Sequence, residues 1–152
     1  MKLAVFDRLA DMQPLVGQEI AVSDWVTISQ ERINQFAEAT GDHQWIHVDV
    51  ERAKSSPFGC TIAHGFLTLS LIPAFGEPSI KIKSIKMGIN YGLNKVRFIN
   101  PVKVNSRVRG RFVLKAFDPI EGGAQVTMTV TIEIEGQDKP ACVAESIARR
   151  FE

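Results

Sequence analysis

The stretch of sequence that decides the fold runs from Thr40 to Pro73 and reads TGDHQWIHVDVERAKSSPFGCTIAHGFLTLSLIP. Its last part, Gly65 to Ile72, is apolar except for two small hydroxyl residues. This composition is typical of a helix that is buried on every side. We expect that helix to span about His64 to Ala74.

Two polar residues stand ahead of this helix. Asp42 and His47 lie five positions apart, just after Gly41. Glycine commonly ends a helix, and the loop that follows is free to present side chains. The sequence therefore predicts a polar pair at the mouth of a buried helix.

Beyond Gly76 the pattern changes from helical to extended, because apolar residues recur every second position. Strands are expected at about 83–98, 106–118, 125–135 and 141–151. The third alternates most cleanly, and its expected inward residues are Val126, Met128, Val130, Ile132 and Ile134. The short connections favour antiparallel pairing. A sheet of this size with one apolar helix predicts an α+β fold in which the sheet wraps around the helix.

The amino-terminal third is expected to hold short elements. Residues 1–16 suit an amphipathic helix ending near Pro14, and residues 19–28 suit an edge strand with a turn. Ser29 is a good N-cap for a helix ending at Gly41. Asp49 to Lys54 predicts a second short helix capped by Asp49.

Composition bounds the function. The 152 residues fit one domain, 1–152, and a net charge of +1 gives no reason to expect nucleic acid or an anionic membrane as partner. Cys60 and Cys142 are far apart, outside any metal-ligand spacing, so we expect two reduced thiols in a cytoplasmic protein, although a disulfide is not excluded. Asp7 and Arg8 interrupt the first apolar run before it could form a signal peptide.

Several short motifs lie along the chain: Gly41-Asp42, His47-Val48-Asp49, Pro57-Phe58, Ile62-Ala63-His64-Gly65, Leu69-Ser70-Leu71, Ile89 to Phe98 and Pro101-Val102. Together they resemble the MaoC-like (R)-specific enoyl-CoA hydratases, in particular the single hot-dog members related to nodulation protein N. The resemblance implies a homodimeric hot-dog enzyme that hydrates trans-2-enoyl-CoA without cofactor or metal. The chain has Gln44-Trp45 where many members carry Asn-Pro, and Pro73 where a serine often lies; both departures bear on the acyl-chain preference.

The resemblance implies that Asp42 and His47 are catalytic. A hydratase must hold water over C3 of an α,β-unsaturated thioester, remove a proton from it and deliver one to C2, which a carboxylate and an imidazole can do together. The sequence leaves the two roles open, and we favour Asp42 as base and His47 as acid. On sequence alone, an aspartate in the place of Asp42 is most often a turn or capping residue, and His47 could equally be a surface histidine.

The start of the buried helix supplies two further candidates. The Gly65 amide could stabilise the enolate oxygen, because a helix begins with unpaired N–H groups. Alternatively, Gly65 serves only close packing, with His64 as a cap. We assign His64 to substrate binding, as a residue that orients the site.

Other polar residues give weaker indications. Asn90, Tyr91, Asn94 and Arg97 could line the acyl or pantetheine channel, or be solvated or paired across the sheet. A basic row could receive CoA phosphates, although a solvated face is favoured; it comprises Arg107, Arg109, Arg111 and Lys115. The spacing of Asp42, His43 and His47 matches no usual zinc motif, so no metal is expected.

Two alternatives to a hydratase remain open. A hot-dog thioesterase would hydrolyse acyl-CoA with a carboxylate-activated water, and a non-catalytic acyl-thioester binding module would not need Asp42 or His47. A fold that serves several activities does not by itself choose between them.

Overall fold

A computed structural model describes residues 1–152 as strands packed with short helices. The strands are β1 (Ala4–Phe6), β2 (Glu19–Val22), β3 (Val26–Thr27), β4 (Ile80–Ile82), β5 (Met87–Phe98), β6 (Arg107–Ile120), β7 (Gly123–Ile134) and β8 (Cys142–Phe151). The helices are the 3-10 helix η1 (Leu9–Leu15) and the α-helices α1 (Gln30–Thr40), α2 (Trp45–Val48), α3 (Val50–Ala53), α4 (Gly65–Ser70) and α5 (Ile72–Ser79).

The main sheet has six strands, in the order β2-β6-β7-β8-β5, with β3 also paired to β6. All its pairs are antiparallel, as the short connections predict. The strands β1 and β4 form a separate parallel pair. The strand β5 pairs only with β8, so it forms an edge of the main sheet.

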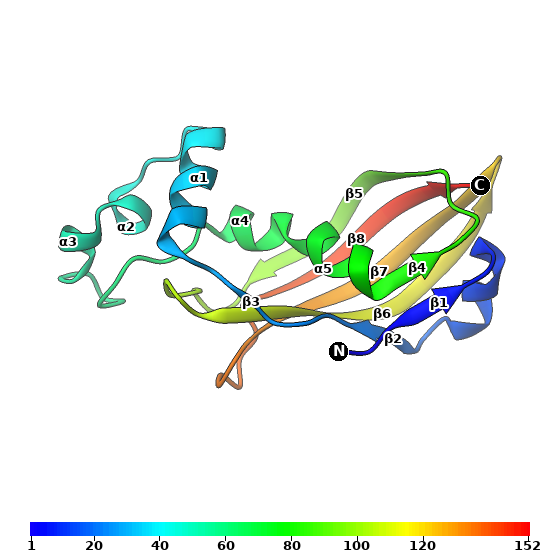
Figure 1. The fold of residues 1–152 in the computed structure, drawn as a ribbon, viewed down its shortest axis with the longest axis horizontal. Coiled ribbons are helices and arrows are strands. Elements are labelled where there is room, and N and C mark those ends of the chain that lie inside the picture. The colour runs from blue at the N-terminus through cyan, green and yellow to red at the C-terminus, as the bar shows by residue number, and fades with distance from the viewer.

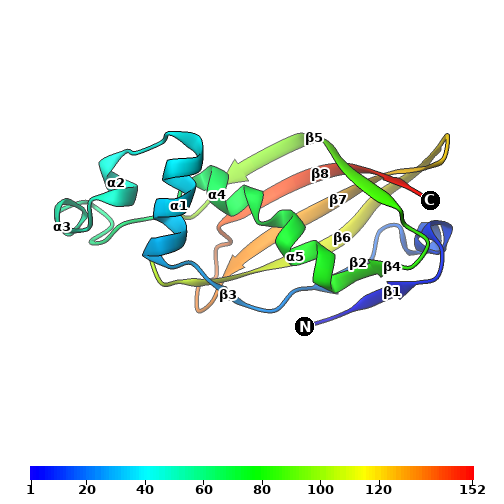
Figure 2. The same ribbon diagram turned by 45° about the horizontal axis from the view of Figure 1, so that its top comes forward.

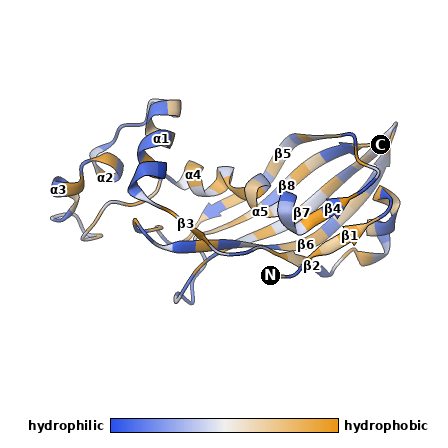
Figure 3. Ribbon diagram, viewed as in Figure 1, coloured by the Kyte–Doolittle hydropathy of each residue, from blue (hydrophilic) through white to orange (hydrophobic).

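The helices α4 and α5 lie across one face of the sheet (Figures 1 and 2). Phe75 of α5 is 1 % exposed and belongs to the same core as Phe112 of β6. The five expected inward residues of β7 are all buried. Figure 3 shows orange and blue alternating along the strands, the pattern of a sheet with one covered face. The expected hot-dog arrangement is confirmed.

The central helix differs from the expectation in two respects. It is two consecutive helices that meet at Leu71, because Pro73 in the first turn of α5 lacks the N–H needed to continue the hydrogen bonds of α4. It is also not buried on every side, since Phe66 is 68 % exposed. Phe66 instead lies edge-on to Phe98 of β5, with ring centroids 5.9 Å apart.

The expected amphipathic helix over residues 1–16 is wrong. Residues 4–6 form β1 through backbone pairing with β4, which is distant in sequence. The following turns form η1, where Leu9 and Met12 are both buried. Their spacing of three matches the period of a 3-10 helix, and in so short a segment the same spacing is compatible with an α-helix.

Three helices project beyond one end of the sheet (Figure 1). The first, α1, begins as expected, with the Ser29 hydroxyl accepting from the Arg32 N–H at 3.2 Å. It ends at Gly41, whose φ of 79° places it in the left-handed region. Asp49 caps α3 as expected, accepting from the Arg52 N–H at 3.0 Å. The one-turn helix α2, which lies between them, was not predicted.

Candidate active site

Three polar side chains meet where α1, α2 and α4 come together. The carboxylate of Asp42 and the imidazoles of His47 and His64 each place a nitrogen or oxygen within 4.8 Å of the others. Asp42 is exposed, whereas His47 and His64 are buried. The fold therefore brings the expected catalytic pair together and adds a second imidazole to it.

The end of α1 positions Asp42. The Gly41 N–H donates to the Ala37 carbonyl at 2.8 Å, and the left-handed conformation then turns the chain out of the helix. The Asp42 carboxylate accepts one long hydrogen bond, 3.3 Å, from the Gln44 N–H. The backbone carbonyl of Asp42 accepts from His64 Nε2 at 2.9 Å. Asp42 is thus held through its backbone, which leaves most of its carboxylate free for a ligand.

His47 is presented by the single turn of α2 and is 7 % exposed. Its Nδ1 lies 2.7 Å from the Ile62 carbonyl oxygen. A carbonyl can only accept, so Nδ1 carries the proton, and in the neutral ring Nε2 keeps its lone pair.

The surroundings of His47 favour its neutral form. Burial is the largest cause and lowers the pKa of the imidazole below its ordinary value. The Ile62 hydrogen bond opposes this shift, His64 adds to it, and the Asp42 carboxylate opposes it. A neutral imidazole with a free Nε2 beside a carboxylate can accept a proton from water.

His64 supports the pair from behind. Its ring is 2 % exposed and stacks on the His47 ring, with centroids 3.9 Å apart and planes 23° apart. The Phe36 ring lies against it at a centroid distance of 4.9 Å. Because Nε2 donates to the Asp42 carbonyl, Nδ1 carries no proton in the neutral ring, and that atom is buried without a partner. His64 thus contacts both members of the pair, and the orienting role expected of it stays a prediction.

Gln30 is a positioning residue that the sequence did not reveal. Its side-chain nitrogen donates to the His47 carbonyl at 2.8 Å, and its oxygen accepts from the Thr61 hydroxyl. Gln30 therefore joins α1 to α2 and to the segment before α4. A glutamine in the first turn of a helix carries no signal of such a role.

Gly65 is the first residue of α4, so its N–H has no acceptor within the helix. A Cβ built on Gly65 would lie 3.0 Å from a ring atom of Phe98. The helix start therefore has no room for a side chain unless the ring moves. This observation fits the close packing considered for Gly65, because the Phe98 ring fills the space that a side chain would take.

The four candidates on β5 are not brought together. Asn90 lines a cavity beneath α5, whereas Tyr91 lies under the Arg149 guanidinium at 3.7 Å. Asn94 donates to Glu145 at 3.4 Å, and the exposed Arg97 donates to the carbonyl of its neighbour Val96 at 2.7 Å. Side chains on successive strand positions point to opposite faces, which separates Asn90 from Tyr91.

The basic row on β6 is matched by carboxylates. Its ion pairs are Arg107 with Glu135 at 2.9 Å, Arg109 with Glu133 at 2.6 Å, Arg111 with Glu19 at 2.9 Å, and Lys115 with Glu145. Arg109 also lies over the Trp25 ring at 4.3 Å. These contacts favour the solvated, paired face over a site for CoA phosphates.

The Asp42, His47 and His64 cluster also has the residue types of a metal site. The two imidazole planes are nearly parallel, however, and ring lone pairs lie in those planes. Their lone pairs therefore do not converge on one point as tetrahedral ligands do. His43, considered in the sequence, instead approaches Glu38 at 3.8 Å. The arrangement suits proton transfer better than metal coordination.

Comparison with known proteins gives the same picture. Residues 11–137 match the family described as MaoC like domain. The chain is 53 % identical over 148 residues to a 3-hydroxyacyl-thioester dehydratase Z of Mycobacterium tuberculosis, covering 97 % of this chain and 98 % of the relative. It is 52 % identical over 143 residues to nodulation protein N of Rhizobium leguminosarum, covering 91 % and 88 %.

A solved structure of an (R)-hydratase from A. caviae superposes with a TM-score of 0.70 at 25 % identity, covering 88 % of this chain and 94 % of that chain. None of the helices is both long enough and apolar enough to span a membrane.

Proposed function

Because the chain belongs to the MaoC-like domain family, we propose that it is a hydro-lyase that adds water reversibly to trans-2-enoyl-CoA, giving (R)-3-hydroxyacyl-CoA. The observation that carries the proposal is the Asp42 and His47 pair, with a neutral imidazole whose Nε2 is free. The names of the M. tuberculosis relative and the A. caviae structure support the same reaction class.

The proton that leaves water is returned to the substrate, so the enzyme gains and loses none overall. His47 Nε2 accepts a proton from water as the water oxygen bonds to C3, and Asp42 accepts a hydrogen bond from the same water. The imidazolium then returns a proton to C2, so the pair ends in the state in which it began. This assignment differs from the roles favoured from the sequence, because His47 serves as both base and acid and Asp42 holds the water. What supports the change is the hydrogen bond that keeps the proton on Nδ1 and leaves Nε2 able to accept one.

The thioester oxygen gains negative charge when water adds to C3. We assign its stabilisation to the Gly65 N–H at the start of α4, which has no acceptor within the helix. His64 contacts both catalytic residues and holds them in register. The substrate would then lie between the helix start and the loop that carries Asp42.

The geometry of the pair bears on the stereochemistry. Asp42 and His47 come from one short segment, so they reach one face of a flat enoyl group, and water and proton arrive from the same side. Syn addition follows from this arrangement. The (R) configuration is carried over from the hydratase named above and from the family resemblance.

The edge strand β5 supports a homodimer. It carries several exposed apolar side chains, namely Met87, Ile89, Tyr91, Leu93 and Phe98. An apolar edge with unpaired backbone groups is a surface that proteins cover by pairing. We expect light scattering at micromolar concentration to give the mass of a dimer or larger, and an active monomer would overturn this part of the proposal.

The reaction is tested by following the enoyl-thioester absorbance with crotonyl-CoA and with a longer enoyl-CoA. Loss of absorbance without release of free thiol is expected. Coupling the product to an (S)-specific 3-hydroxyacyl-CoA dehydrogenase should give no NADH, while chiral chromatography should show one enantiomer. Free thiol released from a saturated acyl-CoA would instead establish the thioesterase. No turnover of either substrate, with tight binding of both, would establish the binding module.

The compartment proposed remains the cytoplasm. Cys60 and Cys142 are not paired with each other, which fits the two reduced thiols expected there.

A further inference from the structure

A cavity of about 520 Å³ lies between α5 and the sheet, away from the catalytic pair. Its apolar wall includes Ile72 of α5 and Val126 and Met128 of β7. On β8 the cavity is lined by Ser146 and Ala148, whose small side chains at successive inward positions leave the space unfilled. The fold therefore keeps an apolar chamber beneath its central helix.

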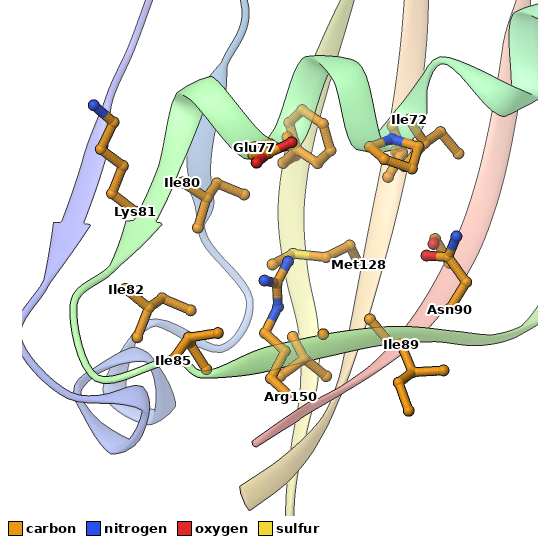
Figure 4. A pocket seen from close by; sticks show the side chains of 18 residues that line it. Ile72, Glu77, Ile80, Lys81, Ile82, Ile85, Ile89, Asn90, Met128 and Arg150 are labelled. Carbon is orange, nitrogen blue, oxygen red and sulfur yellow. The ribbon is translucent and has the colours of Figure 1, made fainter. Parts of the chain in front are cut away.

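One residue that lines the cavity, Arg150, is charged although the inward face of the sheet is otherwise mostly apolar. Along β8, every second residue belongs to the inward face, beginning with the buried Cys142 and Ala144. This alternation puts Arg150 on the inward face and Arg149 on the outer one, where Arg149 lies over Tyr91. Figure 4 shows the Arg150 side chain reaching into the cavity beside Met128.

The guanidinium of Arg150 lacks an anionic partner. Its Nε is buried without a hydrogen-bond partner, and none of the ion pairs in the structure includes Arg150. Burial lowers the pKa of the guanidinium, but arginine remains charged in proteins. Glu77 also lines the cavity, yet it is exposed. Arg150 is half-buried, and a guanidinium with a buried, unpaired nitrogen is incompletely solvated, which indicates that the cavity has a place for an anionic partner.

The cavity also has room for a group next to the guanidinium. Gly88 of β5 is the cross-strand partner of Arg150, and a Cβ built on Gly88 would lie 3.8 Å from Arg150 Nη1. Since Gly88 carries no side chain, that space stays open. Asn90, the next inward residue on β5, lines the same cavity and offers a second polar group.

The cavity and the catalytic site both border β5, and α5, which covers the cavity, follows directly on α4. At the catalytic end, Gly65 of α4 meets Phe98 of β5; at the other end, Gly76 of α5 and Gly88 of β5 line the cavity. From Gly65 to Gly76 the helical path covers roughly 16 Å at the usual rise per residue. An extended chain of about ten carbons, with bonds of about 1.5 Å, covers most of that distance, and the arginine side chain covers the rest.

We propose that this cavity takes an alkyl chain that ends in a carboxylate, and that Arg150 binds that carboxylate. Two sources share this chemistry. The carboxylate is either the far end of the acyl chain of a thioester substrate, an assignment that rests on the proposed function, or the head group of a free fatty acid. Guanidinium and carboxylate form charge-assisted bidentate pairs, which gives the site its selectivity.

The substrate source is tested with three enoyl thioesters: crotonyl-CoA, trans-2-decenoyl-CoA and the ω-carboxylated trans-2-decenedioyl mono-CoA thioester. The enzyme should prefer the carboxylated ten-carbon substrate to its methyl-ended homologue. Arg150→Met should lower kcat/KM for the carboxylated substrate by about tenfold to hundredfold, mostly through KM. The same variant should leave crotonyl-CoA hydration within about threefold and improve turnover of the methyl-ended substrate.

The fatty-acid source is tested by calorimetry with decanoate, which does not depend on turnover. Binding to the wild type that Arg150→Met abolishes, without any preference for the carboxylated thioester, would assign the carboxylate to a free fatty acid. Failure to hydrate crotonyl-CoA would count against the proposed function, but the calorimetric test with decanoate would still decide whether Arg150 binds a carboxylate. If Arg150→Met has the same substrate preference and the same affinity for decanoate as the wild type, the inference is overturned.

Glu77→Gln is the matched control. If Arg150 serves only as a structural partner of Glu77, both variants should lower the melting temperature similarly and leave substrate preference unchanged, which would also overturn the inference. Arg150→Lys, which keeps the charge, should retain part of the preference for the carboxylated substrate. Light scattering of Arg150→Met should match the wild type; dissociation would assign Arg150 to subunit contact instead.

Discussion

Replacing Asp42 with asparagine should separate activity from stability. Asp42 is exposed, and its carboxylate accepts only the 3.3 Å hydrogen bond from Gln44, which an asparagine oxygen can also accept. A surface change of this kind usually alters the free energy of unfolding by no more than about 0.5 kcal/mol. For a domain of this size, we therefore expect the melting temperature to move by about 1–2 °C.

The activity of the same variant should fall much further. The neutral side chain no longer carries the charge that holds the reacting water and stabilises the His47 imidazolium, so a loss of at least about 10²-fold in kcat is expected, equivalent to about 2.7 kcal/mol of activation free energy. The assay follows the absorbance of the enoyl-thioester with crotonyl-CoA at saturation. Circular dichroism melting of the same samples supplies the stability.

Asp49→Asn is the control because it makes the same chemical change seven residues away. Asp49 caps α3, and asparagine is about as good an N-cap as aspartate. This variant should keep both its melting temperature and its turnover. If Asp42→Asn keeps its activity within about threefold, or if both variants lose activity equally, the Asp42 carboxylate neither holds the water nor stabilises the imidazolium, and the mechanism above is wrong.

Four further outcomes are expected. His47→Gln should lower turnover by about 10²-fold or more, and the double variant with Asp42→Asn should lose little more than the worse single one, because the two act as a unit; additive losses would contradict this. The pKa of His47 in the folded protein lies below its unfolded value of about 6.5, so just below that pH the unfolded chain binds more protons than the folded one. The free energy of unfolding should therefore decrease as pH falls below about 6.5. Urea titrations of His47→Gln should show a weaker dependence of this free energy on pH. Burial raises the pKa of Cys142 to about 11, so a thiol reagent at pH 8 should label the half-buried Cys60 in the folded protein and both cysteines only after unfolding. Gly41→Ala should lower the free energy of unfolding by about 1–2 kcal/mol in denaturant titrations, because alanine is strained at a φ of 79°. No clash adds to this cost, since the space around the new Cβ is open.

Local patterns carried much of the fold. The period-two alternation in β7 placed five residues inward, and all five are buried, because a strand with one covered face repeats every second residue. Ser29, Gly41 and Asp49 were identified as helix ends for a similar reason, since a cap depends on residues within one turn of itself. The pairing of Asp42 with His47 was also accessible, because they lie on one short segment.

Contacts between distant segments decided the rest. His64 is 17 residues from His47, and only the return of the chain from α3 to α4 stacks the two rings. The tautomer of His47, and with it the proposed direction of proton transfer, depends on the Ile62 carbonyl. Gln30 acquires its role only because α1 and α2 pack together.

The end of β8 shows the same limit. Two successive arginines look alike in the sequence, yet sheet registration sends Arg149 over Tyr91 on one face and Arg150 into a cavity on the other. Sequence by itself determined the four long strands, the ends of α1 and the place of the Asp42 and His47 pair, because those features depend on near neighbours. The tertiary structure alone decided which imidazole nitrogen of His47 is free and which of the two arginines lines the cavity. Both depend on backbone brought from elsewhere in the chain.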